Sequence, residues 1–140
     1  MKVTAHKIET LFVEYNKKYF DSCLVLPKIA TYIGESSMGI FSVREWKYKR
    51  EEKISIARNF NLEKEEIRDL LLHEMIHQYV YEKYGKMSHG KYFVRKMNEL
   101  NKTYGFDIRK NSKHLFKKYR KGKSLFEKMK AFLFNIRIKS

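Results

Sequence analysis

Residues 73 to 77 read His-Glu-Met-Ile-His, and they lie in a stretch whose apolar spacing predicts a helix. In a helix, residues four apart lie about 40° apart in projection and about 6 Å apart in space. We therefore expect His73 and His77 to point the same way and to share one zinc ion. Glu74 borders the same face, where its carboxylate can act as a general base without binding the metal. The alternative is a pair of surface histidines that are four residues apart by chance.

The flanking residues favour a helix around this motif. Asn61 is a suitable N-cap, and three glutamates follow it where the helix dipole favours acidic side chains. Gly85 follows the last periodic residue, where a glycine commonly ends a helix. The apolar face of this predicted helix consists of Ile67, Leu70, Leu71, Met75 and Val80. The pattern predicts a helix from about residue 62 to Gly85.

A catalytic zinc site usually takes three ligands from the protein, so a third ligand is needed. His89 is the preferred candidate, because a second helix capped by Ser88 can fold back after the turn at Gly85. Glu99, on that second helix, is the competing candidate. His6 and His114 are interpreted as solvated or structurally satisfied histidines.

The composition limits the class of protein. A chain of 140 residues is long enough for one domain with a buried core. Its single cysteine, Cys23, excludes an internal disulfide and a cysteine-based zinc ribbon. No apolar run is long enough to span a bilayer, and the N-terminal residues lack the apolar stretch of a signal peptide. We therefore expect a cytoplasmic, monomeric protein.

The positive charge is concentrated at the C-terminus. Of the formal net charge of +15, residues 110–140 carry +10 and residues 1–109 carry +5. We expect residues 1–109 to form the catalytic domain and residues 110–140 a basic, aromatic-rich extension with an amphipathic helix over residues 124–136. That extension can pack on the domain, bind nucleic acid or lie on an anionic membrane. The basic side chains that would contact DNA are Lys117, Lys118, Arg120, Lys121 and Lys123.

The rest of the chain predicts a mixed α+β fold. Thr4 can cap an N-terminal helix whose apolar stripe runs from Ile8 to Tyr19. Residues 29–58 predict a small antiparallel sheet, with a polar turn at residues 50–53. Residues 53–57 alternate in polarity and are expected to form an edge strand that can pair with an extended peptide substrate.

Taken together, these motifs resemble those of the SprT-like family, which includes the Spartan proteases, over about residues 8–106. The similarity begins in the first helix, continues through Leu26-Pro27 and Gly39, and reaches the segment from Leu71 to His77. It ends with His89-Gly90 followed by Phe93. The order and spacing of these pieces are more specific than any one of them.

The resemblance implies a compact, zincin-like α+β metalloprotease domain. It implies that His73, His77 and His89 bind zinc and that Glu74 is the catalytic base. The family is associated with cleaving proteins that are bound or crosslinked to DNA. Many members carry a cysteine-rich zinc ribbon after the catalytic domain, which this chain lacks, so the basic extension is expected to take over the DNA contact.

The expected reaction is hydrolysis of a peptide bond, with Glu74 accepting a proton from the attacking water. The main alternative is a non-catalytic nucleic-acid-binding module that uses zinc for stability. Such structural sites usually have four protein ligands, and only three good candidates are present here. A protein held on a membrane surface by its C-terminal helix, and a protease inhibited by its own extension, are further alternatives.

Overall fold

The computed structural model describes residues 2–119, which fall into two compact units divided after Lys110. The first unit contains the helices α1 (Ala5–Tyr19), α2 (Lys64–Tyr84) and α3 (Lys91–Tyr104). It also contains the strands β1 (Lys28–Tyr32), β2 (Gly39–Trp46) and β3 (Lys49–Ala57). The protein is thus a mixed α+β chain with a small sheet. None of the described helices is long and apolar enough to cross a membrane.

The helix boundaries follow local capping signals. The Thr4 hydroxyl accepts a hydrogen bond from the Lys7 amide at 3.2 Å, which confirms the predicted start of α1. Helix α2 begins later than expected, because Glu63 rather than Asn61 is its N-cap, with the Glu63 amide donating to the Glu66 carboxylate at 2.7 Å. Both α2 and α3 end at a glycine in the left-handed conformation, the predicted Gly85 for α2 and Gly105 for α3. The prediction that Ser88 caps the second helix was wrong, because the N-cap of α3 is Gly90.

The sheet differs from the predicted antiparallel arrangement. Its strand order is β1-β3-β2, in which β2 and β3 are antiparallel but β1 and β3 are parallel. The prediction that residues 53–57 form an edge strand was wrong, since they belong to the central strand. The physical reason is their apolar content: Ile54, Ile56 and Ala57 are fully buried, and only the central position covers a strand from both sides.

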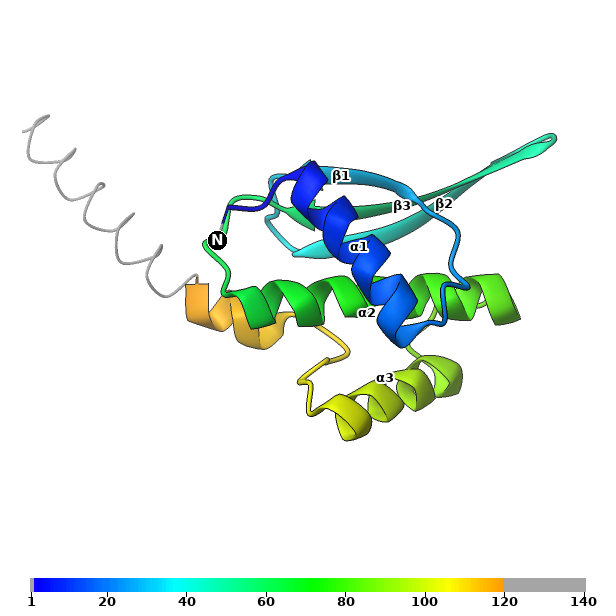
Figure 1. Cartoon of the computed structure of the whole chain (residues 1–140). Coiled ribbons are helices and arrows are strands. Elements are labelled where there is room, and N and C mark those ends of the chain that lie inside the picture. Colours follow the sequence, from blue (N-terminus) through cyan, green and yellow to red (C-terminus); the bar gives the residue numbers. More distant parts are fainter. Residues whose placement is uncertain (1, 120–140) are drawn as a thin grey trace, which may run out of the picture. The chain divides into compact units, whose positions relative to one another are not determined.

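The turn between β2 and β3 also lies elsewhere than expected. Residues 50–53 belong to β3, and the turn is formed by Lys47 and Tyr48. The charged side chains of residues 50–53 suggested a solvated turn. A long hairpin that leaves the body of the domain can, however, hold charged residues within its strands. Figure 1 shows this hairpin running past the labels β3 and β2 to the upper right, beyond the helices.

Helix α2 lies between the sheet and α3 (Figure 1) and contacts β2, β3, α1 and α3. This central position explains why α2 is apolar on more than one face. The large side chains with least exposure come from the helices, the sheet and the segments just before β2 and α2: Ile8, Phe12, Met38, Ile54, Ile56, Leu62, Ile67, Leu71, Leu72, Met75, Ile76 and Phe93. The histidine motif is therefore carried by the most firmly packed helix of the unit.

The second unit begins at Asn111. Its described part is helical over residues 113–119, and the Asn111 side chain accepts a hydrogen bond from the Lys113 amide at 3.0 Å. The helix predicted over residues 124–136, and the basic residues Arg120, Lys121 and Lys123, lie outside the described residues.

Candidate metal centre

Three histidines converge at one point of the first unit. His73 and His77 lie on α2, four residues apart, and His89 lies in the connection that leads to α3. The Nε2 atom of His89 is 2.9 Å from Nε2 of His77 and 3.2 Å from Nε2 of His73. One ring nitrogen from each of the three lies within 4.8 Å of the others, an arrangement that can hold a metal ion.

A phenylalanine orients the three rings. Phe93, fully buried in the first turn of α3, has its ring centroid 4.9, 4.7 and 4.8 Å from those of His73, His77 and His89. Its aromatic edge and face limit the rotation of each imidazole. The sequence marked Phe93 as part of the motif, and its position gives a physical reason for that.

The tautomer of His73 is set by a backbone carbonyl. The Nδ1 atom of His73 lies 2.6 Å from the carbonyl oxygen of Arg109, and because a carbonyl only accepts, Nδ1 carries the proton and donates. The lone pair of His73 is therefore on Nε2, the atom that faces the other two histidines. Metal-binding histidines commonly have such a partner on the ring nitrogen that does not bind the metal. Sequence patterns gave no signal for Arg109, since the group that acts is its main chain.

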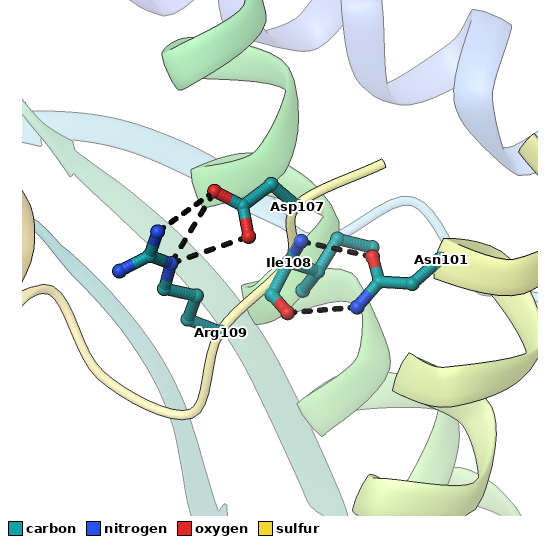
Figure 2. A network of polar contacts seen from close by, with 4 residues as sticks. All are labelled: Asn101, Asp107, Ile108 and Arg109. Carbon is teal, nitrogen blue, oxygen red and sulfur yellow. Dashed lines mark hydrogen bonds and ion pairs between the residues drawn. The ribbon is translucent and has the colours of Figure 1, made fainter. Parts of the chain in front are cut away.

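The segment that supplies this carbonyl is itself held by a side chain. The Asn101 amide donates to the Ile108 carbonyl and its oxygen accepts from the Ile108 amide, both at 2.9 Å. Arg109 forms an ion pair with Asp107 at 3.1 Å. Figure 2 shows both interactions on the stretch that follows α3. Asn101 thus ties the end of α3 to the residue next to Arg109.

Burial keeps the histidines neutral. It lowers the pKa of His73 to about 4, against the opposing effect of the Arg109 carbonyl. It lowers the pKa of His77 to about 3, with a further contribution from the neighbouring His73 and His89. The pKa of His89 is also lowered, by burial and then by the positive charge of Lys110. Neutral imidazoles with converging lone pairs are the form that binds metal ions, so the three residues fit a zinc ion.

Glu74 is buried beside the histidines. Its carboxylate oxygen Oε2 is 3.9 Å from Nε2 of His73, and only 4% of the residue is exposed. Burial raises the pKa of Glu74 to about 8, and a hydrogen bond from the backbone of Phe41 opposes that rise. Glu74 is thus a single carboxylate positioned next to the convergence point but outside the group of three nitrogens.

The space for this carboxylate is provided by Gly39. A Cβ atom at Gly39 would lie 2.7 Å from Oε2 and 3.1 Å from Cγ of Glu74, closer than side-chain contacts normally come. The sequence marked Gly39 as one of the pieces that carry the family resemblance, but gave no sign of its contact with Glu74. Its contact with Glu74 comes from the packing of β2 on α2, which leaves no local sequence signal.

The competing ligand candidates are not part of the group of three. The Glu99 side chain is 58% exposed and forms an ion pair with Lys96 at 3.1 Å. His6 is an exposed residue of α1. Among the described residues, the cluster that can hold a metal consists of His73, His77 and His89.

The fold and the site together define a small α+β domain with a buried glutamate beside a three-histidine centre. The SprT-like family model matches residues 8–114, most of the chain. The chain therefore belongs to the SprT-like family, which confirms the resemblance seen in the sequence. No curated protein matches the chain.

Proposed function

We propose that this protein is a zinc-dependent metallopeptidase of the HExxH type. The observation that supports it most directly is the convergence of three neutral imidazoles with one buried carboxylate, Glu74, 3.9 Å from the nearest of their Nε2 atoms. A structural zinc site is usually closed by four protein ligands, whereas a catalytic site has three and an open position. Three nitrogen ligands and a nearby acid therefore favour catalysis over a purely structural role.

In this proposal His73, His77 and His89 hold the zinc ion and Glu74 moves the proton. Bound zinc would lower the pKa of a water molecule and polarise the substrate carbonyl. Glu74 then accepts a proton from the attacking water at its carboxylate and delivers it to the nitrogen of the leaving amine. The Arg109 carbonyl keeps His73 in the required tautomer throughout.

The edge of β2 is a suitable place for an extended peptide. Within the described sheet β2 is a terminal strand, and its first residue, Gly39, packs against Glu74. A substrate strand paired with this edge through main-chain hydrogen bonds would run past the catalytic carboxylate. Recognition through the main chain implies broad tolerance of substrate side chains.

The test combines metal content with cleavage of an unfolded substrate such as casein. Glu74→Gln is expected to keep one zinc per chain and to lose at least about 100-fold in cleavage rate, because the proton acceptor is gone. His89→Ala is expected to lose zinc as well. Glu99→Gln serves as the matched control, since Glu99 is exposed and outside the cluster, and it is expected to behave as the wild type.

Cleavage retained in Glu74→Gln would exclude Glu74 as the base. Zinc retained in all variants without any cleavage by the wild type would favour the non-catalytic, zinc-containing nucleic-acid-binding module instead.

The proposed substrates are proteins bound or crosslinked to DNA, as membership of the SprT-like family suggests. The basic extension is proposed to contact that DNA through Lys117, Lys118, Arg120, Lys121 and Lys123. Replacing these five side chains by alanine is expected to weaken DNA binding, to reduce its salt dependence and to abolish stimulation of cleavage by DNA. The measurement is casein cleavage with and without DNA. Unchanged DNA affinity would exclude the extension as the contact.

A further inference from the structure

The tip of the β2–β3 hairpin has two faces with different partners. On the face towards α2, Glu45 accepts a hydrogen bond from the Tyr81 hydroxyl at 2.5 Å. Arg50 lies over the Tyr81 ring, 5.2 Å from its centroid, and 3.8 Å from the Glu52 carboxylate. The charged side chains of this face are therefore engaged within the domain.

The opposite face is basic. In the strand register Arg44 is opposite Glu51, Ser42 is opposite Lys53, and Trp46 is opposite Lys49, which places these side chains on one surface of the sheet. Lys53 is also the partner of Lys28 on β1, which extends the surface to the next strand. Cationic side chains outnumber acidic ones here: Arg44, Lys49, Lys53 and Lys28 against Glu51.

Aromatic side chains are exposed among these cations. Tyr48 at the turn is 89% exposed and Trp46 is 42% exposed, unusually high values for large aromatic residues. The Arg44 guanidinium carbon lies 4.9 Å from the centroid of the Trp46 ring, and the Lys47 ammonium lies 5.8 Å from that of Tyr48. A hollow of about 420 Å³ is lined by the residues from Glu45 to Arg50.

We propose that this face of the hairpin binds single-stranded nucleic acid. Basic side chains interleaved with exposed rings suit a polyanion whose bases are free to stack: the cations contact phosphates and the rings contact bases. The bases of a duplex are already stacked on one another, so the rings favour a single strand. The hairpin projects beyond the helices (Figure 1), and the side chains of this face nearest its tip, Arg44, Trp46 and Lys49, are exposed. The proposal does not depend on peptide hydrolysis, and it concerns a different surface from the basic extension.

Trp46 provides a direct probe, because it is the only tryptophan in the chain. The full-length protein is titrated with an oligothymidylate of about 12 nucleotides, within the usual size of single-strand sites. Stacking of a base is expected to quench the tryptophan fluorescence. Heparin, a polyanion without bases, is the control ligand and is expected to leave the fluorescence nearly unchanged.

Substitutions in the hairpin test which side chains contribute to binding of the oligonucleotide. Tyr48→Ala, and separately Arg44→Ala with Lys49→Ala, are expected to raise the Kd for labelled oligothymidylate about 10-fold, measured by fluorescence anisotropy. Lys17→Ala with Lys102→Ala removes the same number of charges from exposed helix positions and is expected to change the Kd much less. None of these residues touches the histidine cluster, so zinc content and circular dichroism serve as checks of folding.

Several results would overturn the proposal. Oligothymidylate binding with unchanged Trp46 fluorescence and an unchanged Kd in the hairpin variants would move the contact elsewhere, including to the extension. Equal quenching by heparin would reduce the surface to a general polyanion site. A blue shift of the Trp46 fluorescence emission on addition of phosphatidylserine vesicles, without any response to oligothymidylate, would assign the hairpin to a membrane surface. Absence of peptidase activity would leave these readouts unaffected, so the two proposals fail separately.

Discussion

At the scale of single residues, the position of the Glu74 carboxylate depends on the absence of a side chain at Gly39. Gly39 has no Cβ, and its backbone approaches the carboxylate more closely than any residue with a side chain could. The φ angle of Gly39 is not in the left-handed region, so the requirement is for space and not for conformational freedom.

The prediction is that Gly39→Ala separates metal binding from catalysis. The added methyl group would displace the Glu74 carboxylate, at a cost of about 1–3 kcal/mol in unfolding free energy. Casein cleavage is expected to fall strongly while zinc content stays at the wild-type level. Gly90→Ala is the matched control, because its Cβ would meet only the flexible Ser88 side chain at 3.1 Å. Full activity in Gly39→Ala would show that the Glu74 carboxylate keeps its working position despite the added methyl group.

A second residue-scale prediction concerns Asn101. Asn101→Ala removes both hydrogen bonds to Ile108 and loosens the segment that presents the Arg109 carbonyl to His73. Loss of such outer support typically lowers metal affinity about 10–100-fold. The measurements are zinc affinity by chelator competition and the His73 tautomer by ¹⁵N NMR of the metal-free protein.

Asn98→Ala, on the exposed side of the same helix, is the control for Asn101→Ala. If both variants bind zinc as the wild type does, Asn101 has only a structural role.

At the scale of elements, the base of the hairpin is joined to α2 through two acidic residues. Glu52 on β3 is 7% exposed, and burial followed by the negative charge of Glu82 raises its pKa to about 7, against the effect of Arg50. Among the described residues, Oε1 of Glu52 and Oε2 of Glu82 are buried without a hydrogen-bond partner. Ionisation of Glu52 therefore opposes the docking of the hairpin on the helix.

The consequence is a pH dependence of stability. A carboxyl whose pKa is higher in the folded than in the unfolded state binds its proton more tightly when folded. The contribution of Glu52 to the unfolding free energy is fully present below about pH 4.5 and is lost as the pH rises to about 7. Glu52→Gln is expected to remove a fall of about 1–2 kcal/mol in unfolding free energy across this range, measured by urea denaturation.

Glu51→Gln, the adjacent position on the opposite face of β3, is the control for Glu52→Gln. If the unfolding free energy changes with pH in the same way in the wild type and in Glu52→Gln, the prediction is contradicted.

At the scale of the whole molecule, the sequence predicted the helices and the histidine cluster better than the sheet. The start of α1 at Thr4 and the end of α2 at Gly85 depend on nearby residues, so the sequence predicted both correctly. The starts of α2 and α3 were misplaced by two residues each, because Asn61 and Ser88 are suitable caps that the structure does not use. The two motif histidines share a helix face through helical periodicity alone. The order of the strands could not be predicted, because alternation indicates a strand but not its partner. For the same reason the sequence identified β3 as a strand and misplaced it at the edge.

Contacts made by the main chain were also invisible in the sequence. The Arg109 carbonyl on His73 and the close approach of Gly39 to Glu74 involve residues about 35 positions apart. Neither leaves a characteristic residue type at a characteristic spacing. The ligands of the candidate site could thus be proposed from the sequence, and the groups that orient them could not.

The prediction for the whole molecule is that zinc stabilises the folded chain. Binding to the folded state alone raises the unfolding free energy by about 2.7 kcal/mol when free zinc is 100 times its Kd. A strong chelator is expected to lower the Tm, and added zinc to restore it, as measured by calorimetry. His89→Ala is the control and is expected to respond weakly to either treatment. A chelator-independent Tm in a wild type shown to bind zinc would mean that the unfolded chain binds the metal equally well.

The contact between His73 and Arg109 has a consequence for how the centre forms during synthesis. Arg109 follows His89, the last of the three histidines, by 20 residues, so a nascent chain presents all three histidines before the carbonyl that fixes the His73 tautomer exists. At translation rates of about 5–20 residues per second, this interval lasts roughly 1–4 seconds. A growing chain that captured metal in that interval would hold it at an unbraced centre. In the proposed zinc site, full affinity would be reached only when the stretch after α3 has been made and secured by Asn101.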